Sequence, residues 1–259
     1  MGDKPELTPE RLEKIRAMGV PSDLWNEERL VRAMLYGDFG SGKTTLAGKI
    51  AHVIGGKVCL ITTDSAWTVL HKEPELSKNI IRYPFEGFSQ VRLMIEAHRV
   101  GEPPFGEVKT FIWDTATTAV DRVLRNLVYG KPFPKEQRDP SLEGYPHYRM
   151  VANLLKEVVD DFSNSDLNVI YTGHIRFPSD ADKDKNKYAI RPNAPEAAYN
   201  VIGQEVQLIG WLFRERDEQR KIRFNGTVQE TAKSQISTIP EKTYLVDQIP
   251  ELIHKWINK

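Results

Sequence analysis

The chain has 259 residues, of which 40% are hydrophobic, and its 36 basic residues balance its 36 acidic residues. This length supports one sizeable α/β core, while the zero net charge excludes a protein-wide field that would recruit nucleic acid or membranes. The charged start "MGDKPELTPERLEK" argues against a secretory signal, and no apolar run approaches the length of a membrane span. We therefore expect a cytoplasmic protein in which the single cysteine, Cys59, is a core residue.

The first part of the chain is predicted to form a small separate unit, residues 1–27, ahead of the main domain, residues 28–259. The stretch "PERLEKIRAM" opens with a helix-start signal and should form a short N-terminal helix. Leu12, Ile15 and Met18 would lie on one face of it, at the spacing of an amphipathic surface helix. We expect this helix to bury that face, either on its own domain or on a neighbouring subunit.

The stretch "YGDFGSGKTT" follows, between a predicted strand at 29–36 and a predicted helix at 43–54. It fits G-x-x-x-x-G-K-[ST], the P-loop pattern. Backbone N–H groups of such a loop form an anion nest, and the dipole of the following helix adds positive potential. We expect Lys43 to reach the β and γ phosphates of ATP, and the Thr44 hydroxyl to bind Mg²⁺. The predicted nucleotide-binding residues are Gly37, Asp38, Phe39, Gly40, Ser41, Gly42, Lys43, Thr44 and Thr45.

Apolar strands alternate with helices along the rest of the chain. Strands are expected at 57–64, 79–85, 108–114 and 167–174, and helices at 89–100, 117–128, 147–162 and 249–257. A hairpin is expected at 206–226 with its turn at Asp217 to Gln219, and long polar loops at 129–146 and 175–195. This order predicts an α/β fold, a three-layer and mostly parallel sheet with an antiparallel edge hairpin.

Two acidic residues that end predicted strands are candidates for catalysis. Asp114 ends "TFIWD" and is the predicted Walker B carboxylate, which would hold Mg²⁺ through water opposite Thr44. AAA+ ATPases normally carry glutamate at the next position as the base that aligns water, but this chain has Thr115. The base must then lie elsewhere, and Asp64, which ends "CLITTD", is the best candidate. The alternative for both aspartates is a helix cap.

These features resemble the RecA/DnaB-like ATPases, and within that group the small phage ATPases associated with single-strand annealing, the Sak-type recombinases. The resemblance rests on the P-loop, the acidic residue closing the second strand, and a Walker B aspartate followed by a hydroxyl residue. It covers residues 28–259 and implies that Asp64 polarises the attacking water. It also implies that His174, in "YTGH", senses the γ-phosphate, although an ordinary strand-end histidine is the alternative. A phage origin would place the protein in the cytoplasm of a bacterial host.

In RecA-like proteins, loops that follow two of these strands line a path for DNA. Their counterparts here are the two long polar loops, whose Lys and Arg residues would neutralise the phosphates of a single strand. Interspersed acidic residues leave a solvated loop as the alternative. Single-stranded DNA is thus the implied partner, with a single-strand-binding protein as a further candidate. The basic residues are Lys131, Lys135, Arg138, Arg176, Lys183, Lys185, Lys187 and Arg191.

RecA/DnaB-like enzymes work as homo-oligomeric rings or filaments with ATP between subunits, and a neighbour supplies a basic finger, often within K-x-R. In "TAKSQIS", Lys233 matches the lysine, but Gln235 stands in place of the arginine. Because arginine fingers supply large rate factors, this departure predicts slow turnover or the use of ATP as an assembly switch. The resemblance implies an ATPase acting on single-stranded DNA. A helicase-loading switch without DNA contact and a small-molecule or nucleotide kinase are the alternatives.

Overall fold

The structure is a computed structural model that describes residues 29–130, 144–178, 190–215, 219–226 and 231–259. The expected N-terminal unit therefore lies outside the described residues. So do six of the eight basic residues proposed to contact DNA, which are Lys131, Lys135, Arg138, Lys183, Lys185 and Lys187.

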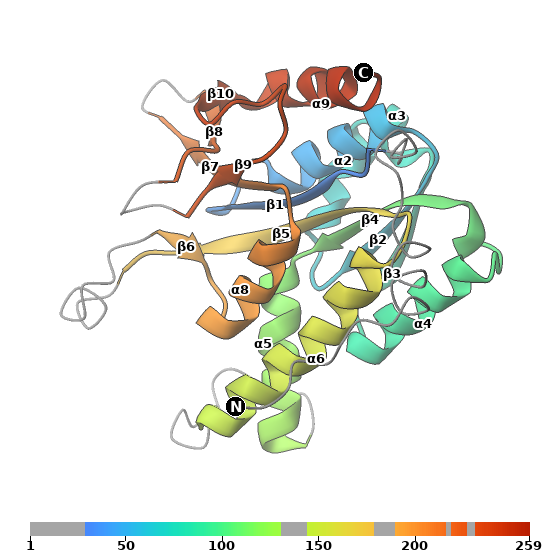
Figure 1. Cartoon of the computed structure of the whole chain (residues 1–259), viewed down its shortest axis with the longest axis vertical. Helices are drawn as coiled ribbons and strands as arrows, with labels where there is room; N and C mark the ends of the chain where they lie inside the picture. The colour runs from blue at the N-terminus through green and yellow to red at the C-terminus, as the bar shows by residue number, and fades with distance from the viewer. Residues whose placement is uncertain (1–28, 131–143, 179–189, 216–218, 227–230) are drawn as a thin grey trace, which may run out of the picture.

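A ten-stranded sheet runs through the centre of the molecule (Figure 1). Its strand order is β10-β8-β7-β1-β5-β4-β2-β3, with β6 paired to β5 and β9 paired to β7. Neighbouring strands from β7 to β3 are parallel, whereas β6, β8, β9 and β10 pair in the antiparallel sense. The strands are β1 (Arg32–Gly37), β2 (Lys57–Thr62), β3 (Ile80–Pro84), β4 (Val108–Asp114), β5 (Asn168–Arg176), β6 (Arg191–Pro192), β7 (Leu208–Arg214), β8 (Arg220–Arg223), β9 (Lys233–Ser234) and β10 (Thr243–Leu245).

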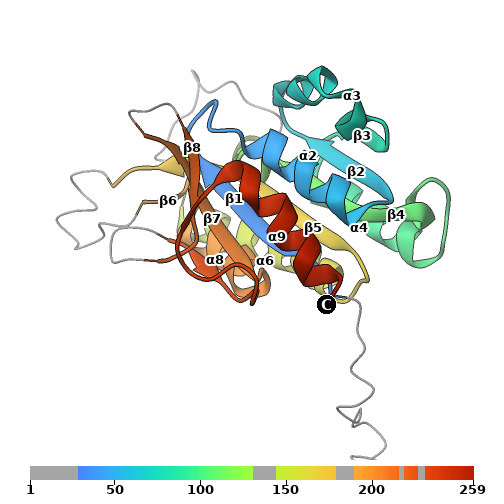
Figure 2. The same cartoon turned by 90° about the horizontal axis from the view of Figure 1, so that it is seen from above.

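Helices cover both faces of the sheet, which gives three layers (Figure 1). One face carries α2 (Lys43–Ile54), α3 (Pro74–Ser77) and α9 (Ile249–Ile257), and Figure 2 shows α2 and α9 side by side along the sheet. The other face carries α4 (Phe88–Arg99), α5 (Ala116–Tyr129), α6 (Tyr145–Ser163) and α8 (Glu196–Glu205). Short 3-10 helices complete the chain at η2 (Ala66–Lys72), η3 (Phe105–Glu107) and η6 (Val246–Gln248).

The protein has a hydrophobic core on each face of the sheet, because successive side chains of a strand point to opposite faces. In β2, Cys59 and Ile61 pack with the helices α4, α5 and α6, whereas Val58 and Leu60 pack with α2. A strand covered on both faces needs apolar residues at every position, which is why "VCLI" has no polar alternation. Cys59 is fully buried, as expected for a core residue, and burial raises the pKa of its thiol. The expected three-layer, mostly parallel α/β fold with an antiparallel edge hairpin is confirmed.

The sequence patterns did not predict α8. Its residues fall between the expected polar loop and the expected hairpin, and only Ala198 and Ile202 are buried. A ten-residue helix with two buried side chains gains little stability alone, so its packing against α6 decides that it forms. Several boundaries also differ by one to three residues, and the largest shift is at β1, which begins at Arg32 instead of residue 29. Strand β2 ends at Thr62, two residues earlier than expected, so Asp64 lies in the turn that follows.

The carboxyl ends of four parallel strands meet at one edge of the sheet. Thr62 of β2 lies opposite Asp114 of β4, and Gly37 of β1 lies opposite His174 of β5. This is the edge at which open α/β sheets bind ligands. Strand register thus gathers residues that are more than a hundred positions apart in the sequence.

No helix in the described part of the chain is long and apolar enough to cross a membrane.

Candidate nucleotide-binding site

The P-loop joins β1 to α2, and two of its glycines are required by geometry. A Cβ atom at Gly37 would lie 2.3 Å from the carbonyl oxygen of Leu212, so only glycine allows β7 to approach this closely. Gly42 has a φ of 94° immediately before α2 begins, a left-handed conformation that favours glycine. Lys43 Nζ donates hydrogen bonds to the carbonyl oxygens of Gly37 at 3.0 Å and Asp38 at 2.7 Å. These bonds fold the lysine back over its own loop.

Asp114 lies at the centre of a buried hydroxyl–carboxylate cluster. Thr44 Oγ1 donates to Asp114 Oδ2 at 2.9 Å, and Thr172 Oγ1 donates to Oδ1. Burial raises the pKa of the Asp114 carboxyl group, while the two threonine hydrogen bonds oppose this rise. The expected pairing of Thr44 with Asp114 is therefore present, and hydroxyl and carboxylate oxygens are ligands that suit Mg²⁺. Thr172, which no sequence pattern indicated, adds the second donor.

Six of the nine predicted nucleotide-binding residues line one cavity of about 430 Å³, whereas Gly37, Asp38 and Ser41 do not. Lys43 is nearly buried in its wall, and burial lowers the pKa of its ammonium group against the opposing charges of Asp114, Asp38 and Asp64. Asp64 also lines this cavity and is exposed to solvent. The lining residues are Phe39, Gly40, Gly42, Lys43, Thr44, Thr45, Asp64, Ser65, Val69, Asp114, Thr115, His174 and Arg220.

His174 separates this cavity from a second one. Its ring lies 4.6 Å from the ring of Phe39, centroid to centroid, and its backbone N–H donates to Thr117 Oγ1 at 3.1 Å. Both rings also line a neighbouring cavity of about 850 Å³, whose wall includes Tyr148 and Arg176. The histidine thus connects the nucleotide cavity with residues that flank the predicted DNA loops.

The two described DNA-contact candidates lie directly opposite each other in the β5–β6 pair. Arg176 lines the 850 Å³ cavity. Arg191 lies 3.7 Å from the carboxylate of Glu196 and over the ring of Tyr199. Arg191 therefore has partners within the fold, and Arg176 is the one of the two that lines this cavity.

Lys233 does not line the nucleotide cavity of its own chain. It lies on β9 opposite Ile209 of β7, three positions before Leu212, which is the residue level with Gly37. Burial lowers the pKa of the Lys233 ammonium group, and the charge of Glu205 opposes this shift. Its assigned role at the subunit interface stays a prediction.

Two arginines of the β7–β8 hairpin were also not expected from the sequence. Arg214 Nη2 donates to the carbonyl oxygen of Gly40 at 2.9 Å, and Arg220 lines the nucleotide cavity. The sequence predicted the hairpin but gave no sign that it would lie beside the P-loop.

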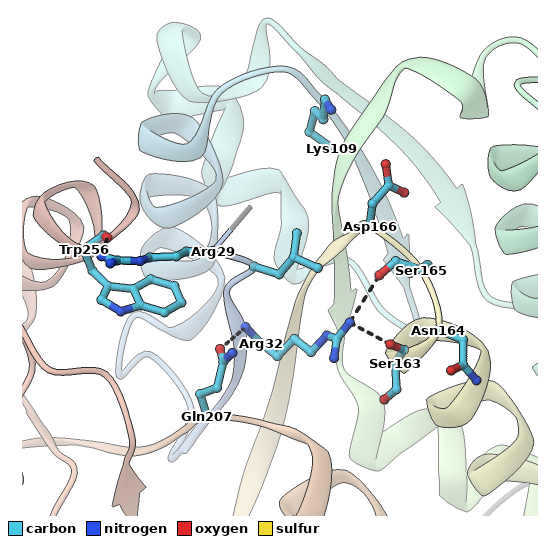
Figure 3. A pocket seen from close by; sticks show the side chains of 10 residues that line it. Arg29, Arg32, Lys109, Ser163, Asn164, Ser165, Asp166, Gln207 and Trp256 are labelled. Atoms are coloured by element: carbon cyan, nitrogen blue, oxygen red, sulfur yellow. Dashed lines mark hydrogen bonds between the residues drawn. The ribbon is translucent and has the colours of Figure 1, made fainter. Parts of the chain in front are cut away.

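A further cavity, of about 740 Å³, lies at the opposite edge of the sheet and includes none of the described site residues predicted from sequence (Figure 3). There the Arg32 guanidinium donates to the carbonyl oxygens of Ser163 at 3.0 Å and Ser165 at 3.2 Å, at the end of α6. A cation at a helix C-terminus stabilises the helix, and the backbone N–H of Arg32 is held by the Gln207 side chain. These contacts give Arg32 a structural role.

Comparisons with known proteins agree with this site. The AAA domain family matches residues 29–236. The crystal structure of the RadB recombinase is 17% identical, with 74% of this chain and 79% of that chain covered and a TM-score of 0.45. An ATPase from the type III secretion system of pathogenic bacteria is 15% identical, with 73% and 52% covered and a TM-score of 0.43, so this chain spans about half of its length. No curated protein matches the chain. Because the family match covers most of the sequence and contains the P-loop, the chain belongs to the AAA domain family and is a P-loop ATPase.

Proposed function

We propose that the protein is a Mg²⁺-dependent ATPase that acts on single-stranded DNA in recombination or annealing, with ATP bound at an interface between subunits. The ATPase part is supported by the four side chains that converge on one cavity from separate elements: Lys43, Thr44, Asp64 and Asp114. The family match alone implies neither the DNA substrate nor the assembly of subunits.

Each of these side chains has a distinct task in this proposal. Thr44 and Asp114 hold the Mg²⁺ ion, which neutralises charge on the phosphates when bound. Lys43 leaves the loop carbonyls and reaches the β and γ phosphates. Asp64 orients the attacking water, for which an exposed carboxylate in the wall of the cavity is suitable. The N-cap residue of η2 is Ser65, which favours this role for Asp64 over helix capping.

The DNA part rests on the wall that the two neighbouring cavities share. Phe39 belongs to the P-loop and His174 to β5, and their rings, which lie in contact at a tilt of 38°, line both cavities. Tyr148 and Arg176, which flank the two predicted DNA loops, line the second cavity. A change at the γ-phosphate that moved the Phe39–His174 pair would therefore be transmitted to both loops.

The test is ATP hydrolysis by the full chain with and without a single-stranded oligonucleotide. We expect several-fold stimulation by the single strand, less by a duplex of equal length, and no hydrolysis by Lys43→Ala. Hydrolysis that is unchanged by the single strand, together with no measurable DNA binding, would favour an ATP switch that does not contact DNA. Gln235 gives this second candidate its specific support, since it replaces the finger arginine with an uncharged side chain.

A further inference from the structure

We propose that Arg220 contacts the α/β side of the polyphosphate bound by its own subunit, and that Arg214 holds the P-loop in position for this contact. This inference rests on the proposed function and adds the β7–β8 hairpin to that site. In this arrangement, part of the positive charge that binds the phosphates comes from the same subunit and not from a neighbour.

Strand alternation places both arginines on the face of the sheet that α2 covers. Leu212 and Ile222 lie opposite each other in the hairpin and are buried in the same core as α2. Arg214 and Arg220 are the next pair on that face, two positions further along each strand and again directly opposite each other. The face that buries the hairpin against α2 thus ends in two arginines at the P-loop.

The contacts confirm this placement. Arg214 Nη2 donates to the carbonyl oxygen of Gly40 at 2.9 Å. A Cβ atom built on Gly42 would lie 3.2 Å from Arg220 Cδ and 3.5 Å from its Nη1, so the guanidinium lies against the residue that precedes α2. Arg220 also lines the 430 Å³ cavity together with Lys43 and Thr44.

Electrostatics gives the reason to expect an anion there. Like charges directly opposite each other in a β-pair are destabilising, and cations are disfavoured at the positive N-terminal end of a helix. Arg214 and Arg220 violate both rules. The cations on the other face of the same hairpin are placed favourably. Lys221 forms an ion pair with Glu215, and the Arg223 guanidinium lies over the ring of Trp211. A polyphosphate in the cavity would convert the repulsion into charge-assisted hydrogen bonds.

The position of the contact predicts which step it affects. The backbone N–H groups at this part of a P-loop cradle the α and β phosphates, whereas the lysine reaches β and γ. A guanidinium beside Gly42 therefore contributes to the binding of ADP and ATP alike, rather than to the transfer of the γ-phosphate. Arg220 is accordingly a binding and positioning residue, distinct from the trans finger that RecA-like enzymes take from a neighbour.

The test compares Arg220→Gln with Lys221→Gln in the full chain. Lys221 is the adjacent residue, loses the same charge, and faces away from the cavity in a surface ion pair of small energetic value. We expect Arg220→Gln to weaken calorimetric binding of both Mg·ADP and Mg·ATP by about 10- to 100-fold, the usual effect of losing a charged hydrogen bond. Lys221→Gln should bind like the wild type, and Arg220→Lys should recover part of the loss. Unchanged thermal unfolding would show that the variants fold.

Three results would overturn the proposal. Equal nucleotide affinity of Arg220→Gln and the wild type would remove Arg220 from the site, and a loss confined to Mg·ATP would move the contact to the γ-phosphate. Recovery of affinity on mixing Arg220→Gln with Lys43→Ala would mean that Arg220 acts on the neighbouring subunit. A wild-type protein that binds no nucleotide would instead refute the proposed function itself, so the two failures are distinguishable.

Discussion

At the scale of single residues, Asp114 is where stability and function oppose each other. Its carboxyl group is fully buried, and burial raises its pKa even though Thr172 and Thr44 donate hydrogen bonds to it. In the absence of Mg²⁺ the folded protein therefore carries a buried charge that its unfolded state does not. Protonation of Asp114 therefore stabilises the fold. This stabilisation is fully present below the unfolded-state pKa of about 3.9, and it is lost as the pH rises through the raised pKa of the folded state.

Asp114→Asn should therefore stabilise the nucleotide-free protein while it abolishes Mg²⁺-dependent hydrolysis. Asparagine keeps the shape: its Oδ1 can accept from one threonine and its Nδ2 can donate to the hydroxyl oxygen of the other, but it carries no charge. At neutral pH we expect a Tm higher by about 2–4 °C, the shift that about 1 kcal/mol produces in a chain of this size. Thermal unfolding across the pH range is the measurement, and the difference should shrink towards pH 4. A lower Tm for the variant at neutral pH would contradict this account.

Asp64 contrasts with Asp114 because it is exposed, and its replacement should leave the fold intact. We expect Asp64→Asn to keep Mg·ATP affinity and to lose about 10²- to 10⁴-fold in kcat, since only the orientation of the attacking water is removed. Separate measurements of nucleotide affinity and turnover distinguish these effects. Wild-type turnover would leave Asp64 without a catalytic role.

At the scale of elements, β5 links the two cavities. It carries Thr172 on Asp114, then His174 against Phe39, and then Arg176 in the wall of the second cavity. Along a strand, alternate residues point to the same face, so these three side chains lie in a row. The second predicted DNA loop, residues 175–195, begins at the last two residues of this strand.

Replacing Lys183, Lys185 and Lys187 with glutamine together tests that loop. If all three contact phosphates, the affinity for a single strand should fall. The slope of log affinity against log salt concentration should also become less steep by about 0.7 per contact, or about 2 overall. Fluorescence anisotropy over a salt series measures both quantities. An unchanged slope would exclude the loop as a phosphate contact. A triple variant elsewhere on the surface, with equal loss of charge, serves as the control: Lys72, Lys78 and Lys255.

At the scale of the whole molecule, the position of Lys233 bears on assembly. The residue lies beside Glu205, away from the edge where Gly37, Asp114 and His174 meet. It is not among the residues that line the nucleotide cavity of its own chain. If Lys233 has a role in hydrolysis, the nucleotide must belong to a neighbouring subunit.

Mixing two inactive variants, Lys43→Ala and Lys233→Ala, tests this arrangement. Each should be inactive alone, but some mixed interfaces combine an intact P-loop with an intact Lys233, so partial ATPase activity should return. Mass measurement must confirm that mixed oligomers form. No recovery in confirmed mixed oligomers would mean that each subunit carries a complete site.

The sequence by itself determined the local parts of this protein. The P-loop is defined by spacing within ten residues, so its helix was expected at the residues where α2 lies, and α9 likewise matches its expected bounds. Strands buried on both faces show as apolar runs, and one such run predicted Asp114 at the end of a strand, where β4 has it. These features depend on neighbours in the chain, and short-range patterns record them.

Only the tertiary structure decided which distant residues complete the site. Thr172 reaches Asp114 because β5 lies beside β4 in a particular register, and α8 forms because α6 offers it a surface to bury against. Arg220 lies at the P-loop because β7 pairs with β1 and turns its hairpin over the start of α2. Such contacts join positions far apart in the sequence, and no local pattern encodes their distance. They exist only once the sheet has fixed its strand order.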